Sequence, residues 1–146
     1  MTLEPTDLLG RWTLDRTIYD HLEGTTITVT GTAEFVTPAP GRIDWVESGV
    51  LHLPAGDVPI TATRHLRQEP DGAWATDFAD GRAFHAWGVG VELVHECSPD
   101  MYRGRLEPEL PAAGRCDRRD AWTMQWAATG PTKDYVIDSR YNRADG

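Results

Sequence analysis

Three charged side chains, Arg16, Glu47 and Arg64, fall at positions that the strand pattern turns toward the interior of the molecule. Charges in such places are costly unless they are paired or hydrated. Because two arginines offer fork-shaped donors, one interpretation is a clamp for the carboxylate or phosphate of an anionic ligand. The other interpretation is a buried Arg–Glu–Arg network, or arginines at a rim that reach water. The pattern leaves both open.

A second group with chemical potential consists of His85, His95 and Tyr102, all at inward positions. Histidine titrates near neutrality, so these residues are candidates for a general acid and base. Either histidine is also an adequate axial ligand for a haem. A core histidine that is simply hydrogen-bonded is the structural alternative. No metal site is expected, since no H-x-H or C-x-x-C spacing occurs and the two cysteines, Cys97 and Cys116, lie far apart.

The chain has six tryptophans, and strand alternation places all of them on the inner face, at positions 12, 45, 74, 87, 122 and 126. Flat rings suit the wall of a ligand cavity. They also fill the interiors of small barrels. We take Trp45, Trp74, Trp87 and Trp126 as the candidates for ligand contact.

The elements that must position these side chains are short strands. Turn signals recur every eight to twelve residues, with β-branched and aromatic residues between them, which is typical of all-β proteins. The sequence predicts a short N-terminal turn or helix at Thr6–Leu9, followed by ten strands: Gly10–Tyr19, Thr25–Val36, Arg42–Leu53, Val58–Glu69, Ala73–Ala79, Arg82–Trp87, Val91–Ser98, Met101–Glu107, Ala121–Thr129 and Lys133–Tyr141. The expected fold is an all-β, antiparallel up-and-down barrel of about 8–10 strands. The stretch from Pro108 to Asp120 is the one long loop.

One hairpin can be put in register from its turn. Asp80-Gly81 is a two-residue type I′ signal, which pairs Thr76 with His85 and Trp74 with Trp87. The same register places Ala83 and His85 on the inner face and Phe84 on the outer face.

The composition sets outer limits on function. At 146 residues the chain predicts a single domain, residues 1–146. A net charge of −9 argues against nucleic acid, because binding there depends on neutralising phosphates. No apolar run is long enough to span a bilayer and the first residues do not resemble a signal peptide, so no membrane partner and a cytoplasmic location are expected. No cofactor is expected, and a homodimer is left open.

Two segments resemble the lipocalin and wider calycin pattern. Gly10-Arg11-Trp12 resembles the G-x-W that opens the first barrel strand, and Thr132-Lys133-Asp134-Tyr135 resembles the T-D-Y segment with one residue inserted. The resemblance implies a calycin-like barrel that binds a small apolar ligand. It also implies that an arginine of the last strand, Arg140 or Arg143, packs on Trp12.

The chain is also similar to three other groups of proteins. With Phe78-Ala79-Asp80-Gly81-Arg82 followed by Phe84-His85, and with Lys133-Asp134-Tyr135 near its end, it resembles an uncharacterised bacterial domain family. The arginines with Tyr141 are similar to the set used by intracellular fatty-acid carriers. An inward histidine is similar to the haem ligand of the nitrobindin barrels.

The leading functional hypothesis is therefore binding of a small aromatic or amphipathic, anionic ligand inside a tryptophan-lined barrel. Arg16, Arg64, His85 and Tyr141 would hold its polar end. One alternative is a cofactor-free isomerase or cyclase in which His85, His95 and Tyr102 move protons. Another is a barrel that binds haem or a related tetrapyrrole.

Overall fold

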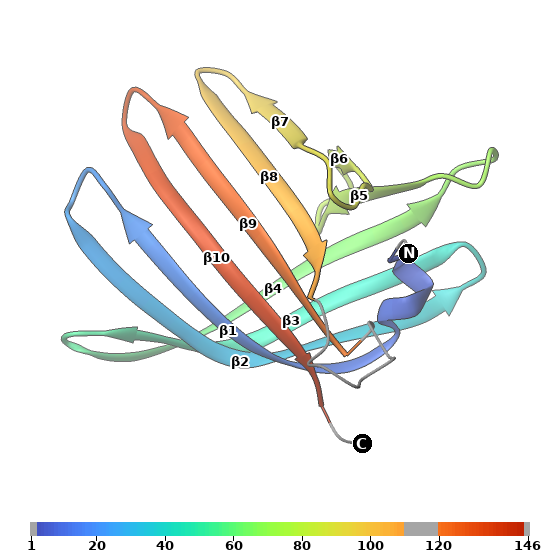
Figure 1. Ribbon diagram of the computed structural model, residues 1–146, viewed down its shortest axis with the longest axis horizontal. Coiled ribbons are helices and arrows are strands. Elements are labelled where there is room, and N and C mark those ends of the chain that lie inside the picture. The colour runs from blue at the N-terminus through green and yellow to red at the C-terminus, as the bar shows by residue number, and fades with distance from the viewer. Residues whose placement is uncertain (1–2, 110–119, 145–146) are drawn as a thin grey trace.

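The computed structural model describes residues 3–109 and 120–144, and nearly all of them belong to one antiparallel sheet (Figure 1). A short 3-10 helix, η1 (Pro5–Leu8), precedes ten strands. They are β1 (Gly10–Asp20), β2 (Thr25–Ala39), β3 (Arg42–Leu53), β4 (Gly56–Gln68), β5 (Trp74–Phe78), β6 (Ala83–Ala86), β7 (Leu93–Cys97), β8 (Asp100–Pro108), β9 (Ala121–Gly130) and β10 (Lys133–Arg143). The predicted all-β class and the ten predicted strands are confirmed.

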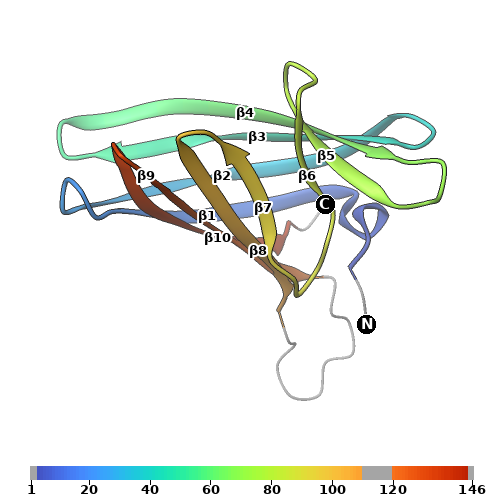
Figure 2. The same ribbon diagram turned by 90° about the horizontal axis from the view of Figure 1, so that it is seen from above.

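The sheet coils into a nearly closed barrel. Its strand order is β6-β5-β4-β3-β2-β1-β10-β9-β8-β7, so every consecutive pair except β6 and β7 is hydrogen-bonded and β1 also pairs with β10. In Figure 2 the β5–β6 hairpin leaves β4 and crosses toward β7 and β8. Where these edges meet, the His95 ring nitrogen Nδ1 lies 2.9 Å from the backbone oxygen of Phe84. The seam is therefore bridged by side chains where a ladder of backbone hydrogen bonds is absent.

The core is aromatic, as the inward alternation predicts. Trp12, Trp45 and Trp122 are at most 2% exposed. Trp122 stacks on Tyr141 with ring centroids 3.9 Å apart and stands edge-on to Trp45 at 5.7 Å. Such contacts stabilise by about 0.5–1.5 kcal/mol beyond the area they bury. Rings fill the middle of this barrel.

The N-terminal end is closed in the way the calycin resemblance implies. The Trp12 indole donates a hydrogen bond to the backbone oxygen of Leu8 at 2.8 Å. The guanidinium of Arg143 lies over the Trp12 ring at 4.0 Å and donates to the backbone oxygen of Leu9 at 2.8 Å. Arg143 is thus the last-strand arginine on Trp12, while Arg140 forms an ion pair with Glu109 at 2.8 Å.

The predicted turn between β5 and β6 is wrong in one detail that matters for the site. Phe78 and Arg82 are joined by a backbone hydrogen bond, so the loop holds three residues, with Gly81 at a φ of 91°. The register then shifts between Thr76 and Asp77. This bulge exposes Ala83 and turns the half-buried Phe84 toward the core, where its ring stacks on Phe78 at 4.3 Å.

The three-residue turn and the bulge offset one another, so the pairing of β5 with β6 beyond the bulge is the predicted one. Thr76 pairs with His85 as predicted, and the amide of Trp87 donates to the backbone oxygen of Trp74 at 2.9 Å. His85 therefore faces inward despite the different turn.

Two further predictions concern membrane-spanning segments and the long loop. In the part of the chain that the structure describes, no helix has the length and hydropathy that a bilayer crossing requires. Cys116 and most of the predicted long loop lie outside the described residues.

Candidate ligand-binding site

The structure brings the inward charges together in one network. Arg16 donates from Nη2 to Oε1 of Glu47 at 2.9 Å, and from Nε to the hydroxyl of Ser139 at 2.7 Å. The other Glu47 oxygen, Oε2, accepts from the Trp45 indole at 3.1 Å and from the Tyr141 hydroxyl. Glu47 is 3% exposed and Tyr141 1%. Both carboxylate oxygens are satisfied, as a buried charge requires.

These contacts shift the titration of the network. Burial alone would raise the pKa of Glu47, but the charges of Arg64 and Arg16, with hydrogen bonds from Tyr141 and Arg16, hold it below its ordinary value. Burial and the adjacent carboxylate raise the pKa of the Tyr141 phenol. The network is therefore an ionised carboxylate held by cations and neutral donors at neutral pH.

Two small residues let Arg16 reach Glu47 from two strands away. On β2, between them, Val29 is the register partner of Arg16, and the next inward positions, Gly31 and Ala33, pair with Gly49 and Glu47 on β3. Because Gly31 and Ala33 carry at most a methyl group, β2 presents only small side chains beyond Val29 on the way from Arg16 to Glu47. The cavity beside this contact measures about 20 Å³, which is room for about one water.

Arg64 is placed differently from Arg16. Its Nη1 lies 3.8 Å from Oε1 of Glu47, and its guanidinium lies over the Trp45 ring at 4.7 Å. Among the described residues it makes no hydrogen bond, and its buried Nη1 lacks a hydrogen-bond partner. Its side chain is 22% exposed. The two interpretations therefore apply to different arginines. Arg16 is part of a buried hydrogen-bonded network, whereas the guanidinium of Arg64 has N–H donors without a hydrogen-bond acceptor in the described chain.

A hollow of about 630 Å³ opens beside Arg64, between β4 and the β5–β6 hairpin. β5 pairs with β4 only over Arg64–Gln68, so the earlier part of β4 lacks a neighbour there among the described strands. The wall includes Phe78 and Phe84, with Thr61 and Thr63 on β4 and Arg82 at the turn. Arg82 is paired with Asp80 at 2.7 Å. Arg64 is therefore the cation in this hollow that has no hydrogen-bonded partner in the described chain.

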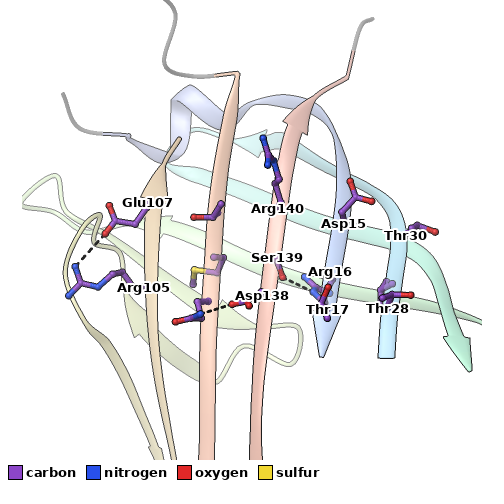
Figure 3. Close-up of a pocket in the computed structure, with 14 residues that line it drawn as sticks. Asp15, Arg16, Thr17, Thr28, Thr30, Arg105, Glu107, Asp138, Ser139 and Arg140 are labelled. Carbon is purple, nitrogen blue, oxygen red and sulfur yellow. Dashed lines mark hydrogen bonds and ion pairs between the residues drawn. The ribbon is translucent and has the colours of Figure 1, made fainter. Parts of the chain in front are cut away.

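A larger hollow, about 710 Å³, lies over five strands, and its lining includes Arg16 and Ser139 of the buried network as well as outward residues (Figure 3). Two rows of outward side chains cross β2, β1, β10, β9 and β8: Thr30, Asp15, Arg140, Thr123 and Glu107 in one, and Thr28, Thr17, Asp138, Gln125 and Arg105 in the other. Polar groups here contact one another, as Gln125 and Asp138 do at 2.6 Å. Most of these groups are exposed, and Arg105 and Arg140 already form ion pairs with Glu107 and Glu109, so this face is a weaker candidate than the Arg64 hollow.

The second predicted group gathers around Phe84. His85 and His95 lie edge-on to the Phe84 ring at 4.7 and 5.2 Å, and the His95 and Tyr102 rings are 5.9 Å apart. Burial lowers the pKa of His85 to about 4, with a smaller contribution from the charge of Arg64. Tyr102 accepts a hydrogen bond from Lys133, a residue that sequence reasoning missed, at 2.7 Å. No hydrogen bond joins the three predicted residues to one another within the described chain.

The candidate tryptophans pack in the core, and none contributes to the wall of either hollow. Trp45, Trp74 and Trp126 are buried. The half-buried Trp87 packs against the core and donates to the backbone oxygen of Leu3 at 3.1 Å. The rings that do line the Arg64 hollow, Phe78 and Phe84, were missed as site residues. Phe84 was predicted to face outward, and no sequence signal revealed the bulge.

The fold is a nearly closed, ten-stranded antiparallel barrel with a buried charge network inside it. The chain belongs to a family of unknown function, DUF6314, whose model matches residues 8–143. No curated protein matches the sequence.

Solved structures share the architecture at low sequence identity. The S-type phycobiliprotein lyase CPES from Guillardia theta superposes with a TM-score of 0.65 at 10% identity, covering 97% of this chain and 91% of that one. The redesigned β-barrel mFAP0, bound to DFHBI, gives 0.49 at 16% identity, covering 94% and 99%. The siderocalin Ex-FABP gives 0.41 at 8% identity, covering 94% and 74%. The likeness to CPES shows the fold alone.

Proposed function

We propose that this protein binds a small anionic ligand with an apolar or aromatic body in the hollow between β4 and the β5–β6 hairpin, with Arg64 holding the anion. One observation carries the proposal. Arg64 makes no hydrogen bond in the described chain, although it borders a hollow of about 630 Å³. A guanidinium without hydrogen-bond partners is the group that a carboxylate or phosphate satisfies best.

The charge balance of the network supports an anion. Two arginines, Arg16 and Arg64, face the single carboxylate of Glu47, and Arg16 makes the shorter contact, 2.9 Å against 3.8 Å. One positive charge is therefore in excess at Arg64. A hydrogen bond to a charged group contributes about 1.5–3 kcal/mol, or about ten- to a hundredfold in affinity.

The walls of the hollow favour a partly apolar body. Phe78 and Phe84 stack at 4.3 Å, and Phe84 stacks in turn on Trp126 at 5.0 Å. Rings held by such a stack offer a rigid apolar wall next to the arginine. This combination suits a planar or short-chain organic acid better than a free inorganic ion.

The test uses cinnamate as the probe and titration calorimetry as the measurement. Arg64→Met keeps roughly the side-chain volume and removes the charge, so we expect affinity to fall about ten- to a hundredfold. Arg103→Met is the matched control, because Arg103 is exposed and pairs with Glu92 away from the hollow. Equal affinity in the wild type and Arg64→Met would show that Arg64 does not hold the anion. Native mass spectrometry of freshly purified protein checks for a retained acid.

A further inference from the structure

Two buried polar atoms next to the hollow have no partner among the described residues. They are the hydroxyl oxygen of Thr76 and the Nε2 nitrogen of His85. Thr76 is 0% exposed and His85 7%. A buried polar atom without a hydrogen bond costs about 1–3 kcal/mol, so two neighbouring ones call for an explanation.

The two residues lie opposite one another on a strand pair. Thr76 on β5 and His85 on β6 are direct register partners, and both belong to the inward-facing side. Directly opposed side chains have Cβ atoms about 4.5–5.5 Å apart. A single small group can therefore contact both.

The hydrogen-bonding roles at this pair follow from His85. Its Nδ1 lies 2.8 Å from the backbone oxygen of Ala86, which can only accept, so Nδ1 carries the hydrogen. With the pKa of the ring lowered to about 4 by burial, His85 is neutral at pH 7 and Nε2 is an acceptor. The Thr76 hydroxyl can donate. A ligand hydroxyl fits this pair, since it can give its hydrogen to His85 and accept one from Thr76.

The pair adjoins the hollow through the same strands. Phe78, two residues after Thr76, and Phe84, directly before His85, both line the hollow, and Phe78 is the register partner of Arg64. The Thr76 and Arg64 positions are diagonal neighbours on one face, a spacing of about 7–8 Å. Thr76 and His85 do not line the hollow themselves, so an acid held at Arg64 reaches them past the stacked rings of Phe78 and Phe84.

We propose that Thr76 and His85 form a subsite for a hydroxyl group at the far end of the same ligand, which makes the ligand class a hydroxylated acid. This inference rests on the proposed function, since Arg64 holds the other end. A site that hydrogen-bonds a hydroxyl discriminates strongly against the analogue without it, because the polar groups are then left unpaired.

The test compares 4-hydroxycinnamate with cinnamate, which differ by one phenolic hydroxyl. We expect the wild type to bind 4-hydroxycinnamate at least tenfold more tightly. Thr76→Val and His85→Leu each remove one partner, so the preference should fall toward unity while cinnamate affinity changes little. Arg64→Met should weaken both acids and keep the preference. Thr32→Val, on the exposed face of β2, is the matched control and should change neither affinity.

The outcomes separate this inference from the proposed function. Equal affinity of the two acids in the wild type, with both dependent on Arg64, overturns the hydroxyl subsite and leaves the anion site intact. Thr76 and His85 would then bind ordered water only. A preference that survives in both Thr76→Val and His85→Leu overturns the subsite as well. Failure of both acids to bind the wild type overturns both proposals.

Discussion

At the scale of single residues, Glu47 is the acceptor at the centre of the buried network. Its two oxygens accept from Arg16, Trp45 and Tyr141, and its charge offsets the neighbouring arginines. The burial that would normally disfavour a carboxylate strengthens these contacts, because the local dielectric is low. Loss of this one charge leaves buried cations and donors without a partner.

Glu47→Gln should therefore destabilise the protein by about 3–5 kcal/mol, the usual cost of stranding one side of a buried ion pair. Urea denaturation at pH 7 measures the change. Glu34→Gln is the control, since Glu34 forms an exposed pair with Arg11 at 3.8 Å and should cost less than about 1 kcal/mol. Similar losses in both variants would mean that the network contributes little.

His85 should make stability depend on pH. Burial lowers its pKa from 6.5 to about 4 in the folded protein, so the unfolded chain binds more protons between these values. The stability contributed by this group is complete above pH 6.5 and is lost as pH falls toward 4, by up to about 3 kcal/mol.

Denaturation midpoints measured from pH 7.5 to 4 test this dependence in the wild type and in His85→Leu. The variant should lose less stability over that window, and His21→Leu, on an exposed turn, should follow the wild type. Parallel curves for wild type and His85→Leu would refute the assignment.

At the scale of elements, the contact between β2 and β3 depends on two opposed glycines. Gly31 and Gly49 are register partners, and a Cβ added to Gly31 would lie 2.2 Å from the backbone oxygen of Ser48. No real Cβ approaches backbone so closely, so the strands would have to separate. That same position lies beside the contact between Arg16 and Glu47.

Gly31→Ala should cost about 1–3 kcal/mol, as overpacked sites usually do, despite the better strand propensity of alanine. Thermal unfolding followed by circular dichroism measures the effect. Thr32→Ala, one residue further along β2 and exposed, is the control and should change stability little. A Gly31→Ala variant as stable as the wild type would show that the strands can move apart freely.

At the scale of the whole molecule, the barrel is weakest where its two edges meet. β6 and β7 each pair on one side only, and the bond from His95 to Phe84 spans the seam. Segments with few packed contacts open at low free energy. The Arg64 hollow borders this seam through Phe84, so ligand entry and seam opening are expected to involve the same elements.

Hydrogen exchange should reveal this weakness. We expect amides of Ala83–Ala86 and Leu93–Cys97 to exchange faster than those of β1, which is paired on both sides. Mass spectrometry of peptic fragments gives the rates. Protection of β6 equal to that of β1 would show a closed barrel in which the seam is no weaker than the rest.

The sequence by itself predicted the strands and the face on which each inward side chain lies. Apolar residues alternate with a period of two between regular turn signals, and that pattern determined the ten strands and the inward positions of the tryptophans. It also placed Arg16, Glu47 and Arg64 on one face, because alternation within a strand needs no knowledge of distant contacts.

Tertiary structure alone decided which of these side chains meet and which remain available. Arg16 rather than Arg64 makes the short contact with Glu47. Arg16 makes it across β2, where Gly31 and Ala33 carry small side chains. The bulge that turns Phe84 inward depends on packing against Phe78 and Trp126 rather than on the local turn signal. Local sequence encodes periodicity, but bulges and charge pairing are settled by contacts between strands distant in sequence, and those contacts define the site.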